Sequence, residues 1–135
     1  MRKIASYGLM ALFLVFLPAV AQSGPPVSVE ILYLNHGPLQ PTLKKVRDLC
    51  DGYGKALTIA WYDSESPEGE KFMAKKGIRG HVPLAIWIAG RTTVVVKGKE
   101  VQFIGFPTGS GPAFYQGKWT TDDLRGAFDL ATGTK

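Results

Sequence analysis

The chain has 135 residues, with 16 basic and 11 acidic side chains and a single cysteine, which indicates one domain with a modest core. Its basic residues are scattered rather than clustered, so the sequence indicates no face for nucleic acid or for an anionic membrane. One thiol excludes an internal disulfide and a redox cycle between two cysteines of the same chain.

Residues 1–21 have the pattern of a secretory signal peptide. Arg2 and Lys3 give a positive start, Leu9–Leu17 is an apolar run without charge, and Ala19-Val20-Ala21 fits a cleavage site. The run is shorter than the roughly 20 apolar residues that span a bilayer, and no cysteine follows it for a lipid anchor. We therefore expect cleavage, a periplasmic or secreted protein, and no stable membrane anchor afterwards.

The first half of the exported chain predicts a strand, a helix and a second strand. Residues 22–26 are expected as a short extended lead-in, and 27–34 form an apolar and β-branched run that suits a buried strand. After a turn rich in glycine and proline, apolar residues recur at helical spacing from Leu39 to Tyr53. A second strand is expected at 56–63.

The next segment predicts a second helix with signals at both ends. Ser66 is expected as its N-cap, Pro67 occupies the first helical position, and Glu68 places an acid in the first turn. The helix is expected to end at Lys76, with Gly77 following in the left-handed conformation.

The last part of the chain predicts strands and a closing helix. A third strand is expected at 83–90, and 92–106 are expected to form a hairpin that turns at Lys97-Gly98-Lys99. Thr120 or Thr121 caps the closing helix. The buried stripe of this helix is expected to contain Leu124, Phe128 and either Ala131 or Leu130.

The elements follow the order β-α-β-α-β-β-α. This order predicts an α/β domain over 27–132, in which a βαβ unit is followed by a hairpin and a covering helix. We expect a central mixed sheet flanked by helices.

Two stretches of this domain resemble the thioredoxin-like family. The sequence KKGIRGHVPLAIWIAG resembles the segment that leads into the family's cis-proline strand, with Pro83 as that proline. The sequence NHGPLQP resembles the family's Cys-Gly-Pro-Cys motif, with His36 and Leu39 in the two cysteine positions. The resemblance implies a thioredoxin-like fold across 27–132, and it places Glu30 where the family has a buried carboxylate.

The missing cysteines change what the resemblance implies for chemistry. In the family, a thiolate at a helix N-terminus attacks a disulfide and a second cysteine resolves the intermediate. Neither His36 nor Leu39 can do this, so we expect a redox-inactive domain and predict no catalytic residue. Cys50 lies on the apolar stripe of the first helix, where burial would raise the pKa of its thiol. A thiol-disulfide activity through Cys50 is kept as an alternative.

We expect the domain to bind a protein or peptide partner in the periplasm or outside the cell. In the family an extended peptide pairs with the backbone just before the proline, at the position of Val82 here, and this contact needs no cysteine. The candidate groove lies beside the proline and at the start of the first helix, and comprises His36, Gly37, Pro38, Leu39, His81, Val82 and Pro83.

Two further hypotheses use the two histidines of the sequence. His36 and His81 could bind Zn²⁺ or Cu²⁺, with Glu30 or a water completing the site. His36 alone could act as a general acid or base, given an unperturbed pKa of about 6.5, although no nucleophile is predicted beside it. The stretch GFPTGSGP lacks the spacing of a phosphate-binding loop, so no nucleotide is expected.

The tryptophans call for two interpretations. Trp61 and Trp87 lie in predicted strands and are expected in the core. Trp119, with Phe114 and Tyr115, flanks a loop at 107–118. These three aromatic residues either seat the last helix or form a surface that contacts a partner.

Overall fold

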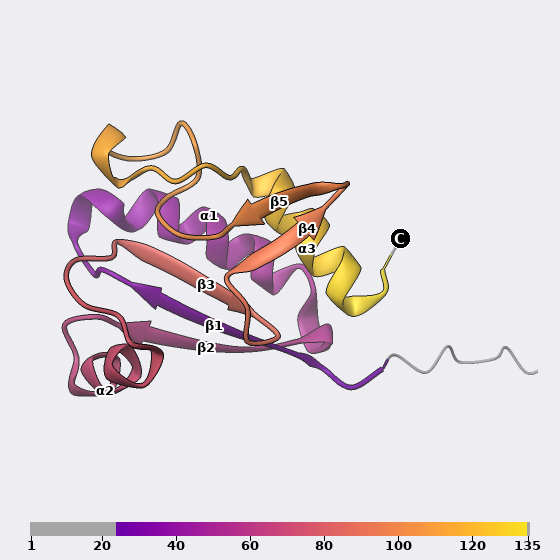
Figure 1. Ribbon diagram of the computed structural model, residues 1–135, viewed down its shortest axis with the longest axis horizontal. Helices are drawn as coiled ribbons and strands as arrows, with labels where there is room; N and C mark the ends of the chain where they lie inside the picture. The colour runs from indigo at the N-terminus through magenta and orange to yellow at the C-terminus, as the bar shows by residue number, and fades with distance from the viewer. Residues whose placement is uncertain (1–23, 135) are drawn as a thin grey trace, which may run out of the picture.

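The computed structural model describes residues 24–134 (Figure 1), and the predicted signal peptide at 1–21 lies outside them. The helices and strands are, in chain order, β1 (Val27–Tyr33), α1 (Gln40–Asp51), β2 (Leu57–Asp63), α2 (Pro67–Lys76), β3 (Leu84–Ile88), β4 (Thr93–Val96), β5 (Lys99–Gln102) and α3 (Thr121–Thr132). The domain is mixed α/β, as predicted. The observed order has one strand more than the predicted order, because the hairpin contributes two strands in addition to β3.

The central sheet has the strand order β2-β1-β3. β1 and β2 are parallel, and β3 is antiparallel to β1, so the prediction of a mixed sheet is confirmed. α1 connects the two parallel strands, because such a pair needs a long crossover. β4 and β5 form a separate two-stranded sheet.

The hairpin turns where the sequence predicts. Lys97 and Gly98 connect β4 to β5 with φ values of 50° and 78°, the positive values that favour a two-residue hairpin turn. The second arm is shorter than predicted, because the chain leaves β5 and returns to the outer edge of β3. There the Ile86 N–H donates to the Phe103 carbonyl at 3.0 Å.

The two faces of the central sheet carry separate cores, because alternate residues of a strand point to opposite sides. One core joins the sheet to α1 and α3 and includes Val29, Val46 and Phe128. The other lies under α2 and includes Phe72 and Trp87. α2 is therefore on the opposite side of the sheet from α1 and α3 (Figure 1). All five residues of β3 are buried, as expected for a strand that is covered on both faces.

The two tryptophans of the strands differ in burial. The prediction that Trp87 lies in the core is confirmed. Trp61 is half-buried at the margin of the first core, and the Arg47 guanidinium lies over its ring at 4.7 Å from the centroid. The arginine covers the face that the core leaves open.

The ends of α2 are as predicted. The Ser66 side chain accepts a hydrogen bond from the Gly69 N–H at 3.0 Å, and Gly77 is left-handed with φ 70°. Gly69 also has a steric role, because a Cβ at this position would lie 1.7 Å from the Asp63 carbonyl oxygen. The absent side chain lets α2 pack closely against the end of β2.

α3 begins as predicted but buries a different set of residues than expected, namely Leu124, Ala127 and Phe128. Thr120 is its N-cap and forms a capping box with Asp123. Leu124 and Phe128 are buried, whereas Leu130 is 61% exposed and Ala131 is also exposed. The prediction that one of these last two residues is buried is wrong, because the last turn of α3 lies outside the core. Among the described helices, none has the length and apolar composition needed to cross a membrane.

Candidate functional site

The two segments of the predicted groove leave the sheet as neighbours. β1 ends at Tyr33, and the N–H of Leu34 donates to the carbonyl of Pro83 at 3.0 Å. The chain after Leu34 leads into α1, and the chain before Pro83 comes from α2. The residues at 35–39 and 81–83 therefore diverge from hydrogen-bonded positions at one end of the sheet (Figure 1).

Most of the predicted groove residues are accessible. His36, Gly37, Pro38 and His81 are exposed, and Val82 and Pro83 are half-buried. The exception is Leu39, which is 2% exposed and belongs to the core beneath α1. Its side chain therefore fills the core rather than the surface that a partner would touch.

The peptide bond before Pro83 is trans, since the described residues contain no cis peptide bond. The expectation of a cis-proline, which came from the family resemblance, is wrong. A trans bond is the intrinsically favoured form, and it lets Pro83 continue the line of β3 so that its carbonyl pairs with Leu34. What this edge can offer a ligand is therefore free backbone groups rather than a cis geometry.

Such free groups are present at Val82. The Ile78 N–H bonds to the Met73 carbonyl at 2.9 Å and closes α2, and the next paired backbone group is the carbonyl of Pro83. Between them, no hydrogen bond from another described residue reaches the backbone of 79–82. Backbone groups need a partner or water, so this segment offers N–H and C=O groups to a ligand.

The outer edge of β3 is also open at this end. The Gly105 N–H donates to the Leu84 carbonyl at 2.7 Å, which is the last bond along that edge. Phe106 then turns away, because its N–H donates to the Tyr115 carbonyl at 2.7 Å. The covering chain therefore leaves the edge before it reaches Pro83.

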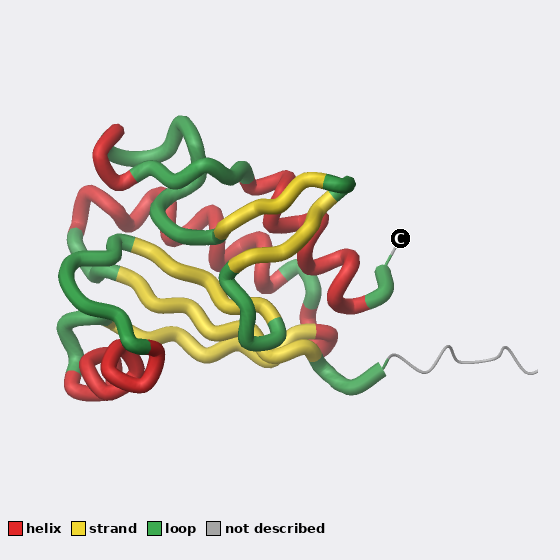
Figure 2. The backbone as a smooth tube through the Cα atoms, in the orientation of Figure 1, coloured by secondary structure: helices red, strands yellow, loops and turns green. Residues whose placement is uncertain are grey.

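The loop at 107–118 lies at the same end of the molecule as the start of α1 (Figures 1 and 2). It is fixed by Trp119, which is buried, packs edge-on against Phe103, and donates from its indole Nε1 to the Gly105 carbonyl at 3.0 Å. Trp119 therefore anchors this loop, and it belongs to the same core as Leu124 and Phe128 of α3. Phe114 is 81% exposed on the same loop, so an aromatic side chain projects from a fixed support.

The start of α1 differs slightly from the prediction. Residues Gly37–Leu39 form a 3₁₀ turn, in which the Leu39 N–H donates to the His36 carbonyl at 3.0 Å, and α1 proper begins at Gln40. No side chain caps this end, and its first turn holds no acidic residue.

His36 pairs with an acid that the sequence did not indicate. Its Nε2 lies 3.3 Å from Glu65 Oε1, and both side chains are largely exposed. Glu30, the expected third ligand, instead accepts from Lys76 Nζ at 2.8 Å on the α2 side of the sheet. Within residues 24–134, no group of three His, Cys, Asp or Glu side chains is placed to hold a metal ion. The arrangement therefore gives no support to a site built from His36, His81 and Glu30.

Cys50 lies where the sequence predicts. Its side chain is buried in the core beneath α1. Burial, followed by the nearby Asp51 carboxylate, raises the pKa of its thiol from an ordinary 9.0 to about 12. At neutral pH the group is a thiol rather than a nucleophilic thiolate.

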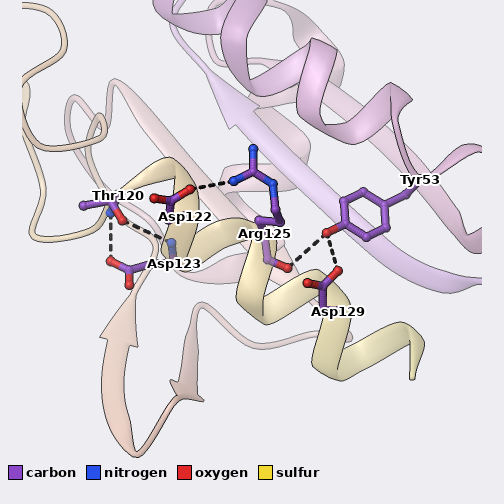
Figure 3. A network of polar contacts seen from close by, with 6 residues as sticks. All are labelled: Tyr53, Thr120, Asp122, Asp123, Arg125 and Asp129. Carbon is purple, nitrogen blue, oxygen red and sulfur yellow. Dashed lines mark hydrogen bonds and ion pairs between the residues drawn. The ribbon is translucent and has the colours of Figure 1, made fainter. Parts of the chain in front are cut away.

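A second polar cluster, which the sequence analysis did not identify, joins the turn after α1 to α3 (Figure 3). The Tyr53 hydroxyl lies 2.6 Å from Asp129 Oδ1 and 3.1 Å from the carbonyl of Arg125. Burial and the bond to Asp129 raise the pKa of Tyr53 to about 12. No sequence signal connects two residues 76 positions apart. The cluster lies beside a shallow cavity of about 850 Å³, and its hydrogen bonds are satisfied internally.

Two features therefore define the candidate site, namely the unpaired backbone of 79–82 and the open edge of β3 beside Pro83. Comparisons with protein-family models, curated proteins and solved structures find no match to this chain.

Proposed function

We propose that this chain is an exported, thioredoxin-like domain without dithiol chemistry, which binds an extended segment of a periplasmic or secreted protein along residues 79–83. The bound segment adds a strand beside Val82 and the start of β3. The start of α1 and the loop at 107–118 flank this position and supply the side-chain contacts that select the partner.

The arrangement of the elements supports the thioredoxin-like part of the proposal. A parallel βαβ unit is followed by an antiparallel third strand, with α1 and α3 on one face of the sheet and α2 on the other. The trans bond before Pro83 departs from the family pattern. For this reason the proposal rests on the open backbone rather than on the proline.

The observation that carries the proposal is the unpaired backbone at Val82. A sheet edge with free N–H and C=O groups is a template for another strand, and proteins that recognise extended peptides use such edges. Affinity then comes from the main chain and specificity from pockets beside it. His36, Pro38 and His81 are the exposed side chains among the predicted groove residues.

Chemistry by thiol exchange is not part of the proposal. Cys50 is the single cysteine of the sequence and is buried. The raised pKa of its thiol removes the nucleophile that such exchange requires. Binding therefore explains the site better than thiol exchange does.

The experiment is a selection of linear peptides from a random displayed library on the immobilised protein, followed by calorimetry with a selected peptide. We expect Val82→Pro, which removes the N–H donor, to weaken binding roughly fivefold, because one hydrogen bond of about 1 kcal/mol is lost. Val82→Ile keeps the donor and the branched side chain and should bind as the wild type does.

Thermal unfolding of each variant checks that the fold is intact, since Val82 also packs beside the core under α2. Val82→Glu provides a second disruption that leaves the backbone donor in place but adds a charge. Equal peptide affinity in the wild type, Val82→Pro and Val82→Glu would overturn the proposal, as would a library that yields no specific peptide.

A further inference from the structure

α3 lies against β4 at a different part of the molecule from the start of β3 (Figure 1), and apolar side chains are exposed there. Val95 of β4 is 59% exposed and Leu130 of α3 is 61% exposed. Both line one hollow of about 650 Å³. We call this surface the α3–β4 patch and define it by Arg91, Thr93, Val95, Glu100, Leu130 and Ala131.

The patch presents a projection next to a depression. Leu130 lines the first hollow and also a second one of about 430 Å³, whose lining includes Val96 and Gly126. Gly126 lies one helical turn before Leu130, and a Cβ there would come within 2.7 Å of Val96 Cγ1. The leucine therefore stands between two hollows on a helix that packs closely against β4.

Such a surface is complementary to a copy of itself. In a contact with two-fold symmetry the same patch occurs on both sides. Leu130 of each subunit can then enter a hollow of the other, and the two Val95 side chains are covered at the same time. Burial of both residues removes apolar area from water in each subunit.

The charges of the patch fit the same symmetry. Arg91 and Glu100 both line the first hollow, and Glu100 lies opposite Val95 in the hairpin. Neither forms an ion pair with another described residue. When two opposite charges flank a two-fold axis, each faces its complement across the interface. A flat patch of one sign would instead repel its copy.

β4 adds a further reason for contact. In the sheet that it forms, β4 is paired only with β5, so its other edge is open. Natural proteins protect exposed edges with charged residues or proline. β4 reads TVVV and has neither inside it. A second subunit over the α3–β4 patch shields this edge.

We propose that the α3–β4 patch is the interface of a symmetric homodimer. The occupant of the patch is a second copy of this chain, held by Leu130 and Val95 at the centre and by reciprocal Arg91–Glu100 pairs at the margin. This inference is independent of the proposed peptide edge at Val82, which the dimer leaves free.

Sedimentation equilibrium tests the interface. The sample is the protein in the form that is recovered after any processing by the cells that produce it. The wild type is expected to be dimeric. Leu130→Lys and Val95→Lys should each weaken the dimer roughly tenfold or more, because a charge then replaces a central apolar contact. Phe114→Lys is the matched control, since it places the same charge on the most exposed large hydrophobic residue of the described chain, outside the patch, and should leave the dimer unchanged.

Charge reversal separates a specific interface from general apolar association. Arg91→Glu and Glu100→Arg should each weaken the dimer, and the double variant should restore it, because the reciprocal pairs are rebuilt with opposite polarity. A wild type that stays monomeric at high concentration would overturn the proposal. This holds even if a different protein is found to bind the patch. A dimer that Leu130→Lys and the charge reversals leave intact would overturn it equally.

Discussion

Val82 and Cys50 have opposite roles at the scale of single residues. Val82 is half-buried and its backbone is unpaired among the described residues, so it is available to a ligand. Cys50 is buried and its thiol stays protonated, so it is withheld from solvent. The chain therefore leaves backbone groups open at Val82 and keeps its single thiol out of reach at Cys50.

The burial of Cys50 predicts that its thiol does not react in the folded protein. A thiol reagent at mildly alkaline pH should modify it only after denaturation, because both access and ionisation are missing. His36→Cys is the control, since it places a second cysteine at an exposed position that should react once without denaturant. Modification of Cys50 at the same rate in native and unfolded protein would contradict this account.

The sequence predicted some of these residues and not others, for physical reasons. The burial of Cys50 follows from helical periodicity, which one segment reveals by itself. The burial of Leu39 was missed because the family resemblance placed it at a surface motif, although Leu39 also fits the apolar stripe. The Tyr53–Asp129 and His36–Glu65 contacts join distant positions, and no local pattern encodes such pairs.

At the scale of elements, capping signals were the most informative part of the sequence. The start and end of α2 were predicted to the residue, because serine, proline and glycine act through local backbone geometry. Exposure of Leu130 was not predicted. Periodicity shows which side of a helix is apolar, but it does not show whether another element covers the last turn.

The capping box of α3 gives a prediction for its stability. Thr120→Ala should lower the free energy of unfolding by about 1 kcal/mol, because the Asp123 N–H loses its acceptor. Thr121→Ala is the control, since Thr121 is the first helical residue rather than the cap, and a change within about 0.5 kcal/mol is expected. Urea unfolding measures both values. Equal losses in the two variants would show that the box does not stabilise α3.

At the scale of the whole molecule, two weak acids, buried Cys50 and half-buried Tyr53, make stability depend on alkaline pH. The pKa values of Cys50 and Tyr53 rise from 9.0 and 10.0 to about 12 on folding. Above the ordinary values, the unfolded chain releases protons that the folded chain keeps, so the free energy of unfolding falls as pH rises from about 9 toward 12. Below pH 9 this contribution is fully present.

Urea unfolding at a series of alkaline pH values measures this fall. Cys50→Ala should remove the part that begins near pH 9, and Tyr53→Phe the part that begins near pH 10. The two variants should therefore show shallower slopes than the wild type. A wild-type stability that is constant or rises across this range would contradict the assignment.

The α/β class and most of the element order also belong to this scale. Both could be predicted, because the alternation of strand and helix patterns limits the possible topologies. The separation of the hairpin from the central sheet could not be predicted. It depends on a long-range contact, because the chain pairs with β3 only after β5, at Phe103.

The account rests on the backbone of Val82, so hydrogen exchange at its amide is the most direct measurement. In the free protein this amide should exchange rapidly, because no described residue accepts a bond from it. In the complex with a peptide selected on the protein, the account predicts that its exchange slows while amides of the α3–β4 patch are unchanged. A peptide that binds while the Val82 amide stays unprotected, with protection appearing elsewhere, would contradict the proposed binding edge.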